Sequence, residues 1–180
     1  MGLFGLGSKK EKAADTKMSL SADGSIGCAR CVLTAGVRNV DMDVNASGSD
    51  NLTLNHGSYS AMGEGAIVTY LDRKGQGQSL RPKKARVLGE QDYWMDICCN
   101  YLDNGEQVEA IMNRLNTVVG ENDFIAGPLS LADPAVAANV LALKKSGNLP
   151  SGLSNIDAWL GRVEQKIPEN LRATYMGLVS

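Results

Sequence analysis

The spacing of apolar residues changes once along the chain, from the period of strands to the period of helices. Between residues 39 and 45 apolar positions alternate with polar ones, and residues 51–57 alternate again, which is the pattern of half-buried strands. The sequence also predicts a short extended segment at 17–23, a helix of about two turns ending at Gly36, and a helix within 60–75. The first part is therefore predicted to have the order β-α-β-β-α.

Beyond residue 80 only the helical spacing remains. Two segments, Trp94–Leu102 and Val108–Val119, repeat apolar residues at i, i+3, i+4 and i+7, which predicts two amphipathic helices. A third helix is predicted from Leu131 to about Lys145, and a fourth contains Ile156–Val163 and ends before Pro168. The fold class is therefore expected to be α+β, with an all-helical second part.

Composition supports the same division. The first 17 residues offer too little apolar surface to offset the entropy of ordering them, so they are predicted to form a flexible N-terminal tail. The predicted organisation is a tail at 1–17, a first domain at 18–77, a linker at 78–86 and a helical domain at 87–180.

The third helix of the second part begins with a capping box. In Ser130–Asp133 the serine hydroxyl is expected to accept from the amide of Asp133, while the aspartate accepts from the amide of Ser130. Ser154 and Asp157 repeat this spacing at the next helix. Because a capping box supplies acceptors to the free amides at the N-terminus of a helix, Ser130 and Asp133 are assigned a structural role.

Composition places the chain among soluble globular proteins. It is 43% hydrophobic and 21% charged, with a net charge of -2, which argues against general nucleic-acid binding. No apolar run approaches the roughly 20 residues that a membrane-crossing helix needs, and the N-terminus lacks the features of a signal peptide. We therefore expect a cytoplasmic protein without a membrane span.

Four cysteines are expected to be reduced thiols in that compartment. Cys28 and Cys31 have the C-x-x-C spacing of redox proteins, and Arg30 between them could favour a thiolate, but the proline of the usual redox motif is absent. Cys98 and Cys99 lie in a predicted helix, where cysteine usually behaves as a small buried hydrophobe. The single histidine has no second histidine to build a metal site, so no metal is expected.

A run of basic residues surrounds the predicted linker. Six of the 18 basic residues fall within fourteen positions: Arg73, Lys74, Arg81, Lys83, Lys84 and Arg86. The run is either a solvated connector, which the sequence favours, or a basic strip for an acidic partner or RNA. No aromatic residue lies among the six positions, so base stacking is unsupported and nucleic acid is an unlikely partner.

Three motifs in order along the chain resemble the cytosolic glutathione transferase superfamily, over roughly residues 18–170. Residues 63–71 are similar to the Glu-Ser-x-Ala-Ile-x-x-Tyr-Leu pattern that ends the thioredoxin-like domain of that family. The Ser130–Asp133 box and the Trp-Leu-x-basic sequence at Trp159–Arg162 match motifs of its helical domain. The resemblance implies a two-domain fold, with a truncated thioredoxin-like half and a helical domain.

The departures from the family fall on the glutathione side. Family enzymes hold the glutathione backbone with a loop containing a cis-proline, but this chain has no proline before Pro82. The family serine that meets the γ-glutamyl carboxylate falls on Glu64, followed by Gly65, so an anion would meet an anion. Residues 46–51 replace a helix and strand, which leaves a shortened first domain.

The resemblance implies two alternative functions. The favoured one is a non-catalytic protein without a cofactor, which serves as a protein–protein assembly or binding module, through transferase-type dimerisation or within a larger complex. The alternative is a divergent glutathione transferase or thiol–disulfide reductase that uses glutathione. In that case Ser25 and Cys28 lie closest to the family's catalytic position at the start of the first helix.

Overall fold

The first part of the chain is a four-stranded sheet with two helices. The computed structural model describes residues 17–45 and 51–179, so the predicted tail, except Lys17, lies outside the described residues. The strand order is β2-β1-β3-β4, with β1 and β2 parallel and the other pairs antiparallel. The elements are β1 (Met18–Ser21), α1 (Ile26–Val37), β2 (Met42–Asn45), β3 (Thr53–His56), β4 (Tyr59–Met62) and α2 (Glu64–Lys74).

The order is β-α-β-β-β-α, so the predicted order lacks one strand. Residues 60–62, which the apolar spacing assigned to the following helix, belong to β4, which pairs with β3 across a tight turn, with Ala61 opposite Leu54. Gly63, at a φ of +83°, separates this strand from α2. The local pattern was wrong here because cross-strand pairing, which the spacing does not report, decides the conformation.

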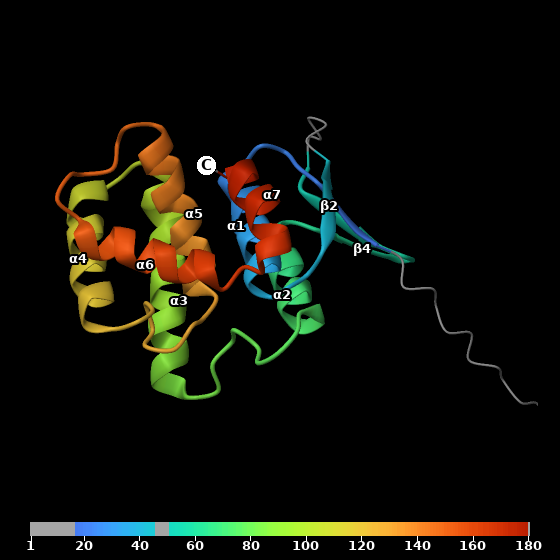
Figure 1. Cartoon of the computed structure of the whole chain (residues 1–180), viewed down its shortest axis with the longest axis horizontal. Helices are drawn as coiled ribbons and strands as arrows, with labels where there is room; N and C mark the ends of the chain where they lie inside the picture. The colour runs from blue at the N-terminus through green and yellow to red at the C-terminus, as the bar shows by residue number, and fades with distance from the viewer. Residues whose placement is uncertain (1–16, 46–50, 180) are drawn as a thin grey trace, which may run out of the picture.

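The second part contains only helices, as predicted. They are α3 (Ala85–Asn100), the short 3-10 helix η1 (Leu102–Asn104), α4 (Val108–Glu121), α5 (Ala132–Lys145), α6 (Ser154–Gln165) and α7 (Glu169–Val179). Helix α7, which the apolar spacing did not lead us to predict, packs beside α1 of the first part (Figure 1). Its Tyr175 hydroxyl donates to the carbonyl of Val40 at 2.8 Å and accepts from the amide of Met42 at 3.0 Å. Helix α7 therefore connects the second part to the first through hydrogen bonds to the backbone of Val40 and Met42.

The helices of the first part lie on one face of the sheet (Figure 1). The strand register places Leu20, Leu54 and Ala61 on this face, and all three are buried. Among the described residues no helix covers the other face. That face carries one apolar side chain, and its residues are Ser19, Ser21, Asp43, Asn45, Thr53, Asn55, Ser60 and Met62. The polar alternation thus fits a sheet that is covered by helices on one side.

Asp133 organises the start of α5. It is fully buried, and its carboxylate accepts hydrogen bonds from the amides of Ile125 (3.0 Å) and Ser130 (2.8 Å) and from Trp159 Nε1 (3.0 Å). The Ser130 hydroxyl donates to this carboxylate at 3.2 Å, whereas we expected it to accept from the Asp133 amide. Burial raises the pKa of Asp133, and the four donors oppose that shift.

The second predicted capping box does not form. Helix α6 already includes Ser154, and no side chain of its N-cap residue makes a capping hydrogen bond. Instead, Asn116 Oδ1 on α4 accepts from the amides of Asn155 (3.1 Å) and Ile156 (3.3 Å). Asp157 pairs with Lys144 at 3.2 Å on the surface. A side chain 39 residues away in sequence therefore takes the capping role.

One apolar core extends through both parts. The buried side chains form a single cluster that includes Leu20 and Leu54 of the sheet, Trp94 of α3 and Trp159 of α6. None of the helices in the described part of the chain is long and apolar enough to cross a membrane.

Candidate functional site

The starts of α1 and α2 meet at a cavity of about 520 Å³. This is the place where the resemblance locates glutathione. Ser25 and Glu64 of the predicted site residues border it, but Cys28 does not. Its lining residues, none of them basic, are Asp23, Ser25, Gly27, Asn51, Leu52, Met62, Gly63 and Glu64.

The N-terminus of α1 is capped by side chains of the chain itself. Ser25 is the N-cap, and its hydroxyl accepts from the amide of Cys28 at 3.2 Å. Asp23 accepts from the amide of Ser25 at 3.0 Å, and hydrogen bonding from Ser25 lowers the pKa of Asp23. The hydroxyl of Ser25 is therefore a helix cap, and an ionised carboxylate lies beside it.

Glu64 occupies the space between the two helix starts. It is the first residue of α2, and its side chain is 25% exposed. A Cβ added at Gly27 on α1 would lie only 2.9 Å from Glu64 Oε2, so the carboxylate lies directly against the first turn of α1. The same oxygen accepts from Arg30 at 3.1 Å.

Arg30 contacts side chains from four other helices. Its side chain is 1% exposed; besides Glu64, it forms an ion pair with Asp103 of η1 and donates to Asn139 Oδ1 of α5 at 2.8 Å. A weak contact of 3.9 Å reaches Cys99 Sγ of α3. Burial alone would disfavour the charge of Arg30, but the carboxylates of Glu64 and Asp103 outweigh it and raise the pKa of Arg30.

The Arg30 cluster joins the two parts of the molecule. Asn139 Nδ2 also donates to Asp103 Oδ1 at 2.9 Å, which closes the network. Arg30 Nε is the one buried side-chain nitrogen or oxygen without a partner among the described residues. The sequence suggested Arg30 only as a neighbour of the cysteines; the signal it could have used is a charged residue inside an apolar helix, which requires buried partners.

The cysteines of α1 are buried and unbonded. Cys28 is 8% exposed and Cys31 fully buried, and both are free thiols. Burial raises the pKa of Cys28, with the charge of Asp23 adding to the effect, and burial also raises the pKa of Cys31. Of the other pair, Cys98 is buried as expected, whereas Cys99 is exposed. Neither thiol of α1 is in a setting that favours a thiolate.

Cys28 faces a second cavity, on the other side of the α1 start. Its volume is about 530 Å³, and apolar side chains of α1, α5 and α7 make up most of its wall. Ser25 borders both cavities, whereas Glu64 and Gly27 border only the first. The structure thus separates the two candidate catalytic residues: Ser25 lies between the cavities and Cys28 in the second.

The other positions considered in the sequence are the loop before β3, Gly65 and His56, and none of them forms a ligand-binding arrangement among the described residues. Among the described residues no peptide bond is cis, and the carbonyl of Leu52, just before β3, accepts from the amide of Gly63 at 3.0 Å. Gly65 is exposed on α2, and His56 Nδ1 lies 2.7 Å from the Tyr70 hydroxyl. The described residues contain no group of three or more His, Cys, Asp or Glu side chains placed to hold a metal ion.

Comparison with solved structures identifies the fold. No protein-family model and no curated protein matches the chain. A theta class glutathione S-transferase from Xanthomonas axonopodis pv. citri, solved with glutathione bound, is 16% identical with a TM-score of 0.69, over 91% of this chain and 97% of that one. The glutathione transferase BmGSTD1 of Bombyx mori is 18% identical with a TM-score of 0.65, over 91% and 98%.

A structure named FzlA from C. crescentus is 12% identical, with a TM-score of 0.72 over 90% of this chain and 92% of that one. Transferases of several classes therefore share this arrangement of a small mixed sheet and a helical part over about nine-tenths of the chain. The chain has the glutathione transferase fold, with a thioredoxin-like first part and a helical second part, as predicted.

Proposed function

We propose that the protein is a non-catalytic relative of the glutathione transferases that serves as a protein–protein assembly or binding module. The observation that carries this proposal is the position of Glu64. Its carboxylate lies between the starts of α1 and α2 and is bound to the buried Arg30. A side chain of the protein therefore supplies the anion that a ligand carboxylate would supply there.

The charge of the cavity, and not a lack of space, disfavours glutathione binding. The cavity is open, so it has room for a ligand, but Asp23 and Glu64 both border it. Glutathione carries two carboxylates and one ammonium group, and like charges at short range repel strongly where water is partly excluded. The backbone clamp with a cis-proline is also absent from the described residues.

Large apolar side chains are exposed at separate places on the surface, on β4 and along α3, and we propose that some of them contact a protein partner. Met62 is 61% exposed and Tyr59 42%, both on the edge strand β4, while Tyr93 on α3 and Tyr101 after it are each 38% exposed. Aromatic residues and methionine are enriched in protein interfaces. The proposed partner is a protein, bound either through transferase-type dimerisation or within a larger complex in the cytoplasm.

The proposal is tested by retention on immobilised glutathione together with a standard conjugation assay. We expect no retention and no turnover above the uncatalysed rate. Specific binding with turnover that disappears in Ser25→Ala or Cys28→Ala would overturn the proposal in favour of the transferase alternative.

The reductase alternative has its own test. A redox-active Cys28 should titrate well below the unperturbed thiol value of about 8.5. Because burial raises the pKa of Cys28, we expect alkylation of this thiol to follow a pKa above that value, and we expect no activity toward a mixed disulfide. A depressed pKa with such activity would establish the reductase instead.

A further inference from the structure

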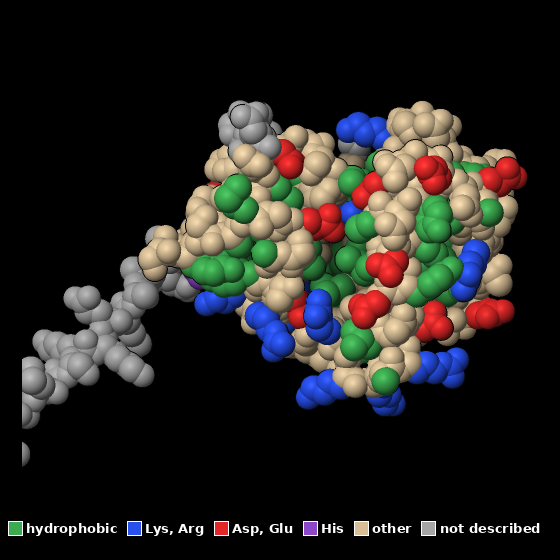
Figure 2. Space-filling model, turned by 180° about the vertical axis from the view of Figure 1, so that it is seen from behind, with side chains coloured by type: hydrophobic (Ala, Val, Ile, Leu, Met, Phe, Trp, Pro, Cys, Tyr) green, Lys and Arg blue, Asp and Glu red, His purple; other side chains and the backbone are tan. Residues whose placement is uncertain are grey.

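Six exposed basic side chains lie in the linker or at its two ends. Figure 2 shows lysine and arginine side chains along the lower edge of the molecule, where the linker runs in Figure 1. All six are exposed, and no acidic residue lies between the first and the last. We call this set the basic linker surface: Arg73, Lys74, Arg81, Lys83, Lys84 and Arg86.

The charges of the basic linker surface are not neutralised from within. Among the described residues none of the six has a carboxylate within ion-pair distance. Lys74 Nζ lies 5.8 Å from the ring centroid of Tyr70, which leaves its charge in place. The nearest acid in sequence, Asp72, is buried and turned inward to Arg38. The surface is therefore available to an anionic partner.

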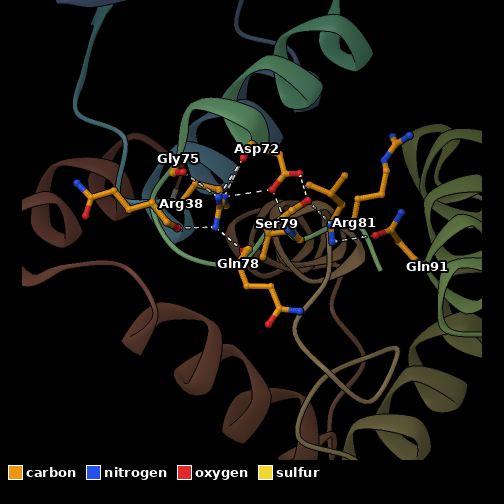
Figure 3. Close-up of polar contacts among 10 residues, drawn as sticks. Arg38, Asp72, Gly75, Gln78, Ser79, Arg81 and Gln91 are labelled. Carbon is orange, nitrogen blue, oxygen red and sulfur yellow. Dashed lines mark hydrogen bonds and ion pairs between the residues drawn. The ribbon is translucent and has the colours of Figure 1, made fainter. Parts of the chain in front are cut away.

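The backbone that carries these charges is fixed by Arg38. This side chain is 4% exposed and forms an ion pair with Asp72 Oδ1 at 3.1 Å. Its guanidinium also donates to the carbonyls of Gly75 (2.9 Å), Gln76 (2.6 Å) and Gln78 (2.5 Å), at the start of the linker (Figure 3). Gly75 is required here, because a Cβ would lie 2.7 Å from the Arg38 carbonyl oxygen.

The middle of the linker is fixed as well. Asp72 accepts from the Ser79 hydroxyl at 2.5 Å and from the amide of Leu80 at 2.8 Å. The carbonyl of Leu80 accepts from the amide of Leu131 at 3.2 Å, which ties the linker to the start of α5. The side chain of Arg81 extends away from this network (Figure 3). A fixed backbone with outward charges loses little conformational entropy when it binds.

The distribution of charge limits the size of the partner. Without these six, the chain has 12 basic and 20 acidic residues, so the remainder carries a charge of -8 against +6 on the linker surface. Figure 2 shows Asp and Glu side chains on the same face, just above the basic ones, so a long nucleic acid or an anionic membrane that extends beyond the basic positions would meet negative charge. A short acidic segment better matches the limited extent of the basic positions.

We propose that the basic linker surface binds a short acidic segment of a partner protein. The proposal rests on the function proposed above, because it names the chemistry of the partner that the binding module would take. Arg38 and Asp72 hold the linker backbone, and the six exposed cations make the contacts.

The test uses the full chain and a short fluorescein-labelled peptide of alternating Glu and Ser, with a Gln and Ser peptide as control. Fluorescence anisotropy should show binding of the acidic peptide that weakens as salt is added. The triple variant Lys83→Gln/Lys84→Gln/Arg86→Gln should weaken binding about tenfold, because three exposed charge pairs are lost. A matched triple variant, Arg114→Gln/Lys144→Gln/Lys166→Gln, removes the same charge elsewhere and should change binding less than about twofold.

Three results would overturn the inference: no binding of the acidic peptide, equal weakening by the two triple variants, or tighter binding of an oligothymidylate or of phosphatidylserine vesicles than of the peptide. The last result would assign the surface to a nucleic acid or to a membrane. Failure here is distinguishable from failure of the proposed function, because the proposed function predicts the absence of glutathione turnover, which the peptide experiment does not test.

Discussion

Two carboxylates at the starts of two helices have opposite surroundings. Asp133, at the start of α5, is fully buried, and its four hydrogen-bond donors are two backbone amides, a hydroxyl and an indole. Glu64, at the start of α2, is 25% exposed and bound to the buried cation of Arg30. The first carboxylate satisfies buried hydrogen-bond donors of the fold, whereas the second lies in the place where a ligand would bind.

The difference suggests which contacts the fold depends on. Asp133 connects the loop before α5 to Trp159 on α6, within a part whose helices follow the apolar spacing of the sequence. Glu64 and Arg30 connect the two parts through charge, beside an open cavity. We therefore expect substitutions to lower stability most at Asp133 and least at Glu64.

Asp133→Ala should lower the free energy of unfolding by about 3 kcal/mol or more, because two buried amides and an indole N–H lose their acceptor. Chemical denaturation of the two proteins measures this. The matched control is Asp157→Ala, which removes the carboxylate with the same spacing in α6. Because Asp157 is exposed, its loss should change stability by no more than about 0.5 kcal/mol. Equal effects of the two substitutions would contradict the comparison.

Arg30→Met should lower stability by about 2–3 kcal/mol, because Glu64 and Asp103 would face each other without a cation. The value is below that of a fully buried pair, since both carboxylates are about a quarter exposed and reach water. Thermal unfolding checks it, with Arg30→Lys as the control that keeps the charge. If Arg30→Met were as stable as the wild type, the ion cluster would not hold the two parts together.

Ser25→Ala should lower stability by about 1 kcal/mol, as expected for the loss of an N-cap. Ser25→Asp, which can also cap α1, should recover most of that stability. The same denaturation experiment measures both variants. A loss of stability in Ser25→Ala that Ser25→Asp does not recover would mean that the hydroxyl has a role other than capping.

Glu64→Gln should have the smallest effect, about 0.5 kcal/mol, because glutamine leaves Arg30 an acceptor and Asp103 keeps the cation paired. Urea denaturation of this variant beside Arg30→Met separates the two ends of the ion pair. An effect as large as that of Arg30→Met would show that Glu64 is as necessary to the fold as its partner.

The regular elements of this fold could be predicted from sequence where local spacing decides them. The four helices of the second part that follow the apolar repeat are present, and so are the strands at Met42–Asn45 and Thr53–His56. Strand β4 was missed because its conformation depends on pairing with β3. Helix α7 was missed although its buried residues, Leu171, Tyr175 and Val179, recur at helical spacing.

The candidate site was less predictable than the fold. The sequence placed Ser25 and Glu64 near each other through a resemblance, and they border one cavity. It did not show that Arg30 would pair with Glu64 and Asp103, since these residues are 34 and 73 positions apart. Likewise, Asn116 on α4 caps α6 in place of the capping box expected at Ser154. This contact depends on the packing of α4 against α6, which the local sequence does not report.

The central claim is that the cavity does not bind glutathione. Its most direct test is isothermal titration calorimetry, with glutathione titrated into the wild-type protein. If Glu64 and Asp23 make the cavity unfavourable for this ligand, no binding should be detected up to about 1 mM glutathione, equivalent to a binding free energy weaker than about -4 kcal/mol. A dissociation constant well below that concentration would contradict the account.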